Sequence, residues 1–235
     1  MKNLITILNI LLLPYYSFSQ DAASYHYSGL KKSIDGNHRE AVVDYTKAIE
    51  LDPKHVDSYY ARASSKAQLG DYKGSIMDYT ITIELNSKRG DAYNGRGMVK
   101  SELKDYHGAI LDYSKAIELN SRSYLSYYFR GHVKGSLHDI RGAIADYTKA
   151  IEYKPDFADA YFYRGTLKDR LEDTKGAIAD YSKTIEFNPK HSKAYLNRGV
   201  NKILIGQKDS GCLDMSKAGE LGRGEVYDMM RKFCN

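Results

Sequence analysis

The sequence predicts an all-α protein built as an α-solenoid, in which antiparallel helix pairs stack into a right-handed superhelix that ends in a C-terminal capping helix. Two observations predict this class. A stretch typified by GAIADYTKAIEYKP at residues 142–155 occurs five times, each copy 34 residues after the last. Within each copy, apolar and small residues recur every three or four positions, as in amphipathic helices. A fixed period of this length is typical of stacked repeats, which present extended surfaces and seldom a catalytic pocket.

The repeats are predicted to occupy residues 20–221. Each contains two helices joined by a tight turn, and Pro53, Pro155 and Pro189 end the second helix because proline cannot continue one. With Ala22 as position 1, the predicted repeats are 22–55, 56–89, 90–123, 124–157 and 158–191, with a degenerate sixth repeat over 192–221. One hairpin cannot bury its apolar face alone, so neighbours stabilise each other. Residues 222–235 are expected to cover the last repeat.

Residues 1–19 have the layout of a secretory signal peptide. Lys2 precedes a nearly unbroken apolar run over residues 4–13, Pro14 breaks the helix, and Ser17 and Ser19 are small residues at the expected cleavage site. The run is shorter than the about 20 residues that span a membrane. We therefore expect an exported protein, periplasmic or secreted from a bacterial envelope, with no stable membrane span after cleavage. An uncleaved anchor is the alternative.

The two cysteines of the chain lie near its C-terminal end. Cys212 and Cys234 occupy the ends of two expected helices, 210–221 and 225–233, that are remote from the turn at Gly222 and Gly224. Antiparallel packing brings those ends together, and an even count in an oxidising compartment favours a disulfide. Two buried free thiols are the alternative. A redox or metal role has little support, because there is no CxxC motif and no neighbouring histidine.

Small and aromatic residues recur at fixed positions of the repeat. Small residues occupy positions 8, 20 and 27, as in Gly131, Ala143 and Ala150, where two helices must approach closely. Aromatic residues recur at two positions. Position 4 holds Tyr25, Tyr59, Tyr93, Tyr127, Tyr161 and Tyr195, and position 24 holds Tyr45, Tyr79, Tyr113, Tyr147 and Tyr181. This pattern resembles the tetratricopeptide repeat family; the resemblance covers nearly all of the chain after residue 20 and implies a protein-interaction module.

A second pattern concerns charge. Position 23 is Asp in all six repeats, and position 7 is Arg in every repeat except the first, which has Ser28. We expect each Asp to pair with the Arg of the following repeat, because the first repeat then needs no Arg. The predicted ladder is Asp44–Arg62, Asp78–Arg96, Asp112–Arg130, Asp146–Arg164 and Asp180–Arg198. Lys recurs at position 11, from Lys32 to Lys202, and we expect it to be solvated or to contact backbone.

The resemblance implies a concave groove lined by the first helix of each repeat. The candidate peptide-binding residues on this face are Tyr60, Asn94, Met98, Tyr128, Phe129, His132, Phe162 and Tyr163. An extended peptide or a docked helix suits such a surface, although packing within the solenoid is an alternative role for the rings. Asp57, Asp91 and Asp159 at position 2 suit either a basic partner or solvation. A carboxylate clamp of the kind some family members use is doubtful, because only Asn94 matches it.

Composition narrows the function further. The 35 basic and 30 acidic residues are interspersed and give a net charge of +5, which is typical of a solvated helical surface rather than a nucleic-acid footprint. No HExxH, paired metal-ligand spacing or glycine-rich phosphate loop is present, so we expect no enzyme activity, cofactor or metal. The sequence predicts a non-catalytic scaffold that binds a protein or peptide. The alternatives are an accessory subunit of an envelope enzyme or assembly complex and, less well supported, an electrostatic binder of nucleic acid or anionic lipid.

Overall fold

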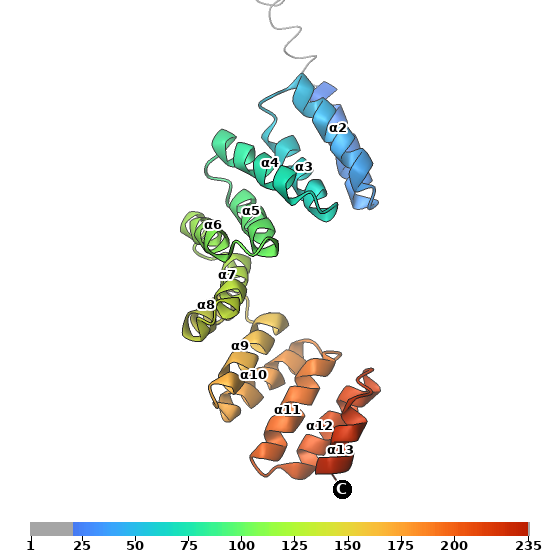
Figure 1. The fold of residues 1–235 in the computed structure, drawn as a ribbon, viewed down its shortest axis with the longest axis vertical. Coiled ribbons are helices and arrows are strands. Elements are labelled where there is room, and N and C mark those ends of the chain that lie inside the picture. Colours follow the sequence, from blue (N-terminus) through green and yellow to red (C-terminus); the bar gives the residue numbers. More distant parts are fainter. Residues whose placement is uncertain (1–20, 235) are drawn as a thin grey trace, which may run out of the picture. The chain divides into compact units, whose positions relative to one another are not determined.

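The computed structural model describes residues 21–234, and in that range every regular element is a helix (Figure 1). The first repeat contains a helix over residues 21–34 and α2 (His38–Leu51). The next four pairs are α3 (Val56–Gln68) with α4 (Tyr72–Leu85), α5 (Gly90–Glu102) with α6 (Tyr106–Leu119), α7 (Tyr124–Ser136) with α8 (Ile140–Tyr153), and α9 (Ala158–Arg170) with α10 (Thr174–Phe187). The last helices are α11 (Ser192–Leu204), α12 (Lys208–Glu220) and α13 (Val226–Phe233). The predicted signal peptide lies outside the described residues.

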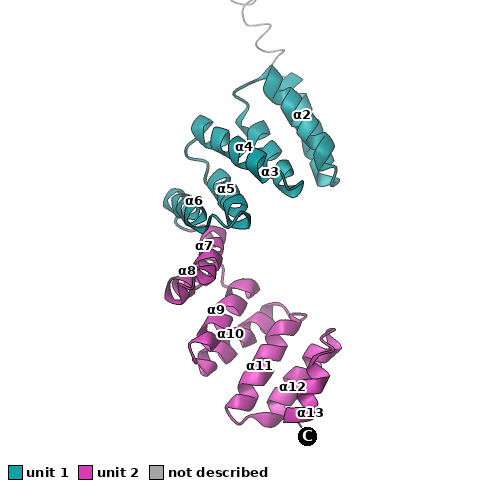
Figure 2. Cartoon of the chain, viewed as in Figure 1, with its two compact units in different colours: residues 1–121 teal, residues 122–235 magenta. Residues whose placement is uncertain are grey.

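The helices form two compact units, residues 1–121 and 122–235 (Figure 2). Within unit 1, α3 packs against α4 and α4 against α5; within unit 2, the same alternation runs from α7 to α13. Within a unit, each second helix therefore contacts its own partner and the first helix of the next repeat in that unit. This stacking confirms the predicted all-α class of consecutive helix pairs, whereas the right-handed twist remains a prediction.

The core of each repeat is made by the small and aromatic positions of the sequence pattern. Tyr113 and Tyr181 at position 24 are 2% and 0% exposed, and Ala109 and Ala143 at position 20 are fully buried. Position 8 must stay small because a Cβ built on Gly97 would lie 2.9 Å from the Tyr113 ring. Close helix approach, with a ring filling the gap beside it, thus explains the residue types that recur.

Four second helices begin with the same N-cap. The Asp139 carboxylate accepts the Gly142 backbone N–H at 2.9 Å, and equivalent bonds join Asp71, Asp105 and Asp173 to the glycines three residues later. Such a cap satisfies a backbone donor that the helix itself leaves unpaired. The cap also explains why glycine occupies the third helix position, since a Cβ on Gly142 would lie 2.0 Å from the carboxylate oxygen.

The predicted inter-repeat ladder of Asp and Arg is wrong. Each Arg pairs within its own repeat, with the Asp sixteen residues later: Arg164 Nη2 lies 2.7 Å from Asp180 Oδ1 and Arg164 Nε 2.9 Å from Oδ2. Lys168 Nζ also contacts Asp180 at 2.9 Å, so the expectation that position 11 is solvated or bonded to backbone is wrong too. The same intra-repeat geometry joins Arg62–Asp78, Arg96–Asp112, Arg130–Asp146 and Arg198–Asp214, with Lys66, Lys100, Lys134 and Lys202 on the same carboxylates.

The link between repeats runs through the third nitrogen of the guanidinium. Arg164 Nη1 donates to Thr148 Oγ1 of the preceding repeat at 3.1 Å, as Arg62, Arg96 and Arg198 do to Thr46, Thr80 and Ser182. In the first repeat, Ser28 Oγ donates to Asp44 Oδ2 at 2.6 Å, and Lys32 also contacts this carboxylate. Among the described residues no repeat precedes this one, so Ser28 is consistent with an inter-repeat bond made by the Arg of each later repeat.

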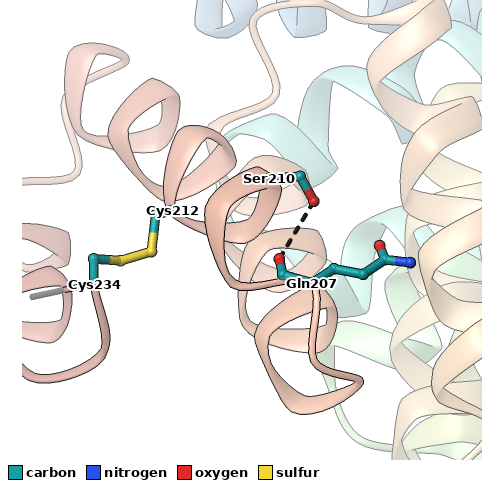
Figure 3. The surroundings of a disulfide bond; sticks show 4 residues. All are labelled: Gln207, Ser210, Cys212 and Cys234. Carbon is teal, nitrogen blue, oxygen red and sulfur yellow. Dashed lines mark hydrogen bonds between the residues drawn. A yellow bond between two sulfur atoms is a disulfide. The ribbon is translucent and has the colours of Figure 1, made fainter.

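The C-terminal helix α13 lies on α12. Val226 and Met215 are fully buried there, and Met229 and Met230 pack against the same cluster, whereas Phe233 is 50% exposed. Cys212 and Cys234 are joined at the far end of this pair, with their Cα atoms 5.8 Å apart (Figure 3). Beside them, Ser210 Oγ donates to the Gln207 carbonyl at 3.3 Å at the start of α12. The two cysteines are therefore at disulfide distance, as the antiparallel packing of their helices predicts.

Among the described helices, none combines the length and the apolar character that a membrane crossing requires.

Candidate functional site

The predicted aromatic residues of unit 2 form one continuous row on the first helices of two neighbouring repeats. On α7, Tyr128 contacts Phe129 with ring centroids 5.4 Å apart, and it faces Tyr163 of α9 at 6.0 Å. His132 reaches Tyr163 at 5.4 Å, and Phe162 reaches it at the same distance from within α9. The structure thus brings all five predicted residues of this unit together.

A pocket of about 220 Å³ opens beside this row. His132 of α7 and Tyr163, Thr166 and Arg170 of α9 line its sides, and the buried Tyr147 of α8 closes its floor. Tyr147 stacks on Tyr163 with centroids 6.0 Å apart, and burial raises the pKa of the Tyr147 hydroxyl. The phenol therefore stays protonated at physiological pH and can serve as a hydrogen-bond donor or acceptor.

The remaining predicted residues lie in unit 1. Tyr60 on α3 packs against Tyr79 with centroids 5.6 Å apart, while Asn94 and Met98 lie on the next first helix, α5. Asn94 is half-buried, and Met98 is 45% exposed. Tyr60 lines a second pocket, of about 300 Å³, to which Asn94 and Met98 do not contribute.

This second pocket contains a charged group that the sequence pattern did not single out. Arg89, the N-cap residue of α5, lies over the Tyr60 ring, its Cζ 4.3 Å from the ring centroid, and forms a salt bridge to Asp57. Arg89 Nε also lies 3.1 Å from Asp91 Oδ1. The Arg89 guanidinium holds the pKa of Asp57 below its usual range by hydrogen bonding to the ionised carboxylate.

His26 also lines this pocket, and its ring contacts that of His55. The rings of His26 and His55 are 5.0 Å apart, and His55 Nδ1 accepts the Ser58 backbone N–H at 3.2 Å as the N-cap of α3. His26 Nδ1 lies 3.1 Å from Ser58 Oγ. Burial lowers the pKa of His26, and the neighbouring His55 lowers it further. His26 therefore takes up a proton less readily than an exposed histidine does.

A similar histidine caps α11 in unit 2. His191 Nδ1 accepts the Ala194 N–H at 3.1 Å, and its ring packs on Phe162 with centroids 4.4 Å apart. Burial lowers the pKa of His191, an effect that the carboxylate of Asp159 opposes. Asp159 is exposed in the first turn of α9, and it makes no ion pair or hydrogen bond to any residue of the described range.

Sequence reasoning missed two residues of the inter-repeat loops: Arg89, which lines the pocket of unit 1, and His191, which packs on Phe162. Arg89 and His191 occupy the last position of their repeats, outside the helix positions that the family groove uses. A signal was present, because this position is aromatic or cationic at four of five repeat ends: His55, Arg89, Phe157 and His191. Among the described residues, no group of three or more His, Cys, Asp or Glu side chains is placed to hold a metal ion.

The paired helices and the exposed first-helix face define this chain as an array of helical hairpins of the protein-interaction class. Models of the tetratricopeptide repeat family match residues 44–76, 90–123 and 128–192. The repeats of this chain are tetratricopeptide repeats.

Solved structures of low sequence identity share the fold. PilF of Pseudomonas aeruginosa aligns with a TM-score of 0.80 at 17% identity, over 92% of this chain and 99% of PilF. YrrB, described as a tetratricopeptide repeat protein with an unusual peptide-binding site, aligns with a TM-score of 0.66 at 22% identity, over 80% of this chain and 97% of YrrB. MamA aligns with a TM-score of 0.64 at 24% identity, over 70% of this chain and 96% of MamA. Curated protein sequences give no significant match.

Proposed function

We propose that this chain is an exported, non-catalytic scaffold that binds a segment of a partner polypeptide along the first-helix face of its repeats. The observation that carries the proposal is the ring row of unit 2 beside its pocket. Tyr128, His132, Phe162 and Tyr163 come from neighbouring repeats, remain half-buried or exposed, and meet one another edge to face. Rigid amphipathic rings of this kind supply contact area at low cost in side-chain entropy.

Two further observations support a peptide as the ligand. Each pocket mixes rings with polar groups, Thr166 and Arg170 in unit 2 and Asp57 and Arg89 in unit 1. The relative YrrB is described as having a peptide-binding site. Peptides docked in a groove use pockets of this kind for alternate side chains. Export is supported by the cysteine pair at disulfide distance, which suits an oxidising compartment.

The test is selection of binding peptides from a displayed random library against the folded chain, followed by affinity measurement on groove variants. Tyr128→Ala with Phe162→Ala is expected to weaken the selected peptides at least tenfold, because both ring contacts are lost. The matched control is Tyr153→Ala with Phe187→Ala, which removes two rings from the ends of α8 and α10 in the same repeats. Thermal unfolding of all variants shows that they remain folded.

Two results would contradict the proposal. One is equal loss of affinity in the groove and control variants. The other is binding that disappears with added salt and is unchanged by ring removal, which would favour an electrostatic surface.

A further inference from the structure

Unit 1 already contains a cation bound in the groove. Arg89 lies over the Tyr60 ring and forms a salt bridge to Asp57, three residues before Tyr60 on the same face of α3. A guanidinium over an aromatic face with a carboxylate beside it combines cation–π attraction with a charge-assisted hydrogen bond. These three positions of the repeat therefore form a site for a positively charged group.

The same three positions recur in unit 2 without the cation. Asp159 and Phe162 of α9 correspond to Asp57 and Tyr60, and His191 takes the place of Arg89. The His191 ring covers Phe162 at 4.4 Å, so the loop residue occupies the equivalent position. Its Nδ1 is used to cap α11, and burial lowers its pKa, so the ring is neutral near pH 7.

Asp159 is consequently a groove carboxylate with an aromatic neighbour and no cation. Asp57 and Asp91, its counterparts in the groove face of unit 1, both pair with Arg89. The charged groups around His191 do not replace that cation, because Arg223 pairs with Glu225 at 2.6 Å and Lys193 makes no ion pair to any described residue. Tyr128 of α7 adds a second ring near Asp159: burial raises the pKa of the Tyr128 phenol, and the charge of Asp159 raises it further.

We infer that the groove of unit 2 binds a cationic side chain, lysine or arginine, of its partner polypeptide at the Asp159 carboxylate, beside the His191 ring that covers Phe162 and near the ring of Tyr128. The inference rests on the proposed function and specifies the partner: a segment with a basic residue flanked by apolar ones. The ammonium or guanidinium of the partner gives Asp159 the positive charge that Arg89 of the chain itself gives Asp57 in unit 1.

The test uses two small probes and the full chain. Nα-acetyl-lysine methylamide and its uncharged analogue Nα-acetyl-norleucine methylamide are titrated into isotopically labelled protein at pH 7.5, and NMR shifts at Asp159, Phe162 and Tyr128 are followed. The lysine probe is expected to shift these signals saturably and to bind about tenfold more tightly than the norleucine probe. Asp159→Asn is expected to abolish that preference.

The matched control is Asp209→Asn, which removes the same charge from the exposed first turn of α12 in the same unit. It is expected to leave the preference for lysine unchanged. Equal binding of the two probes to the unaltered chain, or equal loss in the Asp159 and Asp209 variants, would overturn the inference. Neither result would contradict the proposed function. Library peptides that lack basic residues would still bind the ring row, and the variant without Tyr128 and Phe162 would still bind them more weakly.

Discussion

At the scale of single residues, each repeat is fixed by one carboxylate that several donors share. Asp180 is 3% exposed and accepts both Arg164 and Lys168, while the remaining guanidinium nitrogen reaches the hydroxyl of Thr148 in the preceding repeat. A buried ion pair is not in itself a strong source of stability, but removing one partner leaves the other charge uncompensated. The arrangement therefore fixes the spacing of helices within a hairpin and between hairpins.

Replacing this carboxylate tests its role. Asp180→Asn is expected to lower the free energy of unfolding by about 3 kcal/mol, because Arg164 and Lys168 lose their shared counter-charge in a buried position. Glu186→Gln, which removes an exposed partner of Lys183, is expected to change it by less than about 0.5 kcal/mol. Urea denaturation followed by circular dichroism measures both. Similar small effects in the two variants would contradict a structural role for Asp180.

Two half-buried histidines predict a loss of stability in acid. His26 and His191 have pKa values lowered from 6.5, so below that pH the unfolded chain binds more protons than the folded chain and the free energy of unfolding falls. The groups around them are His55, Asp57 and Arg89 for His26, and Asp159, Lys193 and Arg223 for His191. The stability that their neutral forms contribute is complete above pH 6.5 and decreases as the pH falls through the lowered values.

His191→Asn separates this effect from general acid denaturation. Asparagine keeps an N-cap acceptor for α11 and does not titrate, so the decrease in stability between pH 7 and pH 5 should become smaller. His107→Asn, on an exposed side chain at the start of α6, should leave that decrease unchanged. Denaturation midpoints across the pH range provide the measurement, and identical pH profiles for the two variants would refute the assignment.

At the scale of helices, contact between α11 and α12 depends on two glycines. A Cβ on Gly211 would lie 2.6 Å from the Gly199 carbonyl oxygen, and a Cβ on Gly199 would lie 2.7 Å from the Gly211 carbonyl oxygen. Backbone atoms in two packed helices cannot move aside as a side chain can. The sixth repeat therefore has glycine at position 20, where the earlier repeats have alanine or serine.

Gly211→Ala is expected to destabilise the chain by about 2 kcal/mol through this overlap. Gly135→Ala is the control within α7, because its Cβ would meet nothing closer than Ala143 Cβ at 3.9 Å. The control should stabilise by about 0.8 kcal/mol, since alanine is the better helix former. Thermal unfolding measures both variants. A lower midpoint for Gly211→Ala and a higher one for Gly135→Ala would support the close approach of α11 and α12, and a higher midpoint for Gly211→Ala would contradict it.

The elements were predictable from the sequence, whereas the ion pairs were not. The period gave helices beginning at Val56, Gly90 and Tyr124 because small, aromatic and capping residues repeat in register. In a regular array, however, every position 7 has one position 23 before it and one after it, so periodicity cannot decide between the two partners. Only the packing of a hairpin, which places Arg164 opposite Asp180, decides between them.

In the candidate site, the helix residues were predictable from the sequence, whereas the loop residues were not. Its rings lie on helix faces that the repeat pattern identifies, as with Tyr128 and Phe162. Arg89 and His191 lie in loops, and their directions depend on the cap geometry and on which ring lies beneath them. Neither is determined by residue spacing.

At the scale of the whole molecule, the disulfide holds the C-terminal helix on the last repeat. Cys212→Ser with Cys234→Ser is expected to cost about 3 kcal/mol in the chain-entropy description of a closed loop. The loss should be local, because each repeat contacts only its neighbours. Hydrogen exchange should accelerate in α13 and α12 and stay unchanged in α3. Uniform acceleration throughout the chain would contradict a local cap.

The register of α13 has a consequence for engineering. It begins at Val226, 34 residues after α11 begins at Ser192, so it starts where the first helix of another hairpin would start. If a copy of residues 158–191 were inserted after residue 191, a copied α9 would follow α10, and the copied α10 would precede α11 as α10 does now. The chain can thus be lengthened by whole repeats, and each added repeat would lengthen the surface available to a ligand that spans several hairpins.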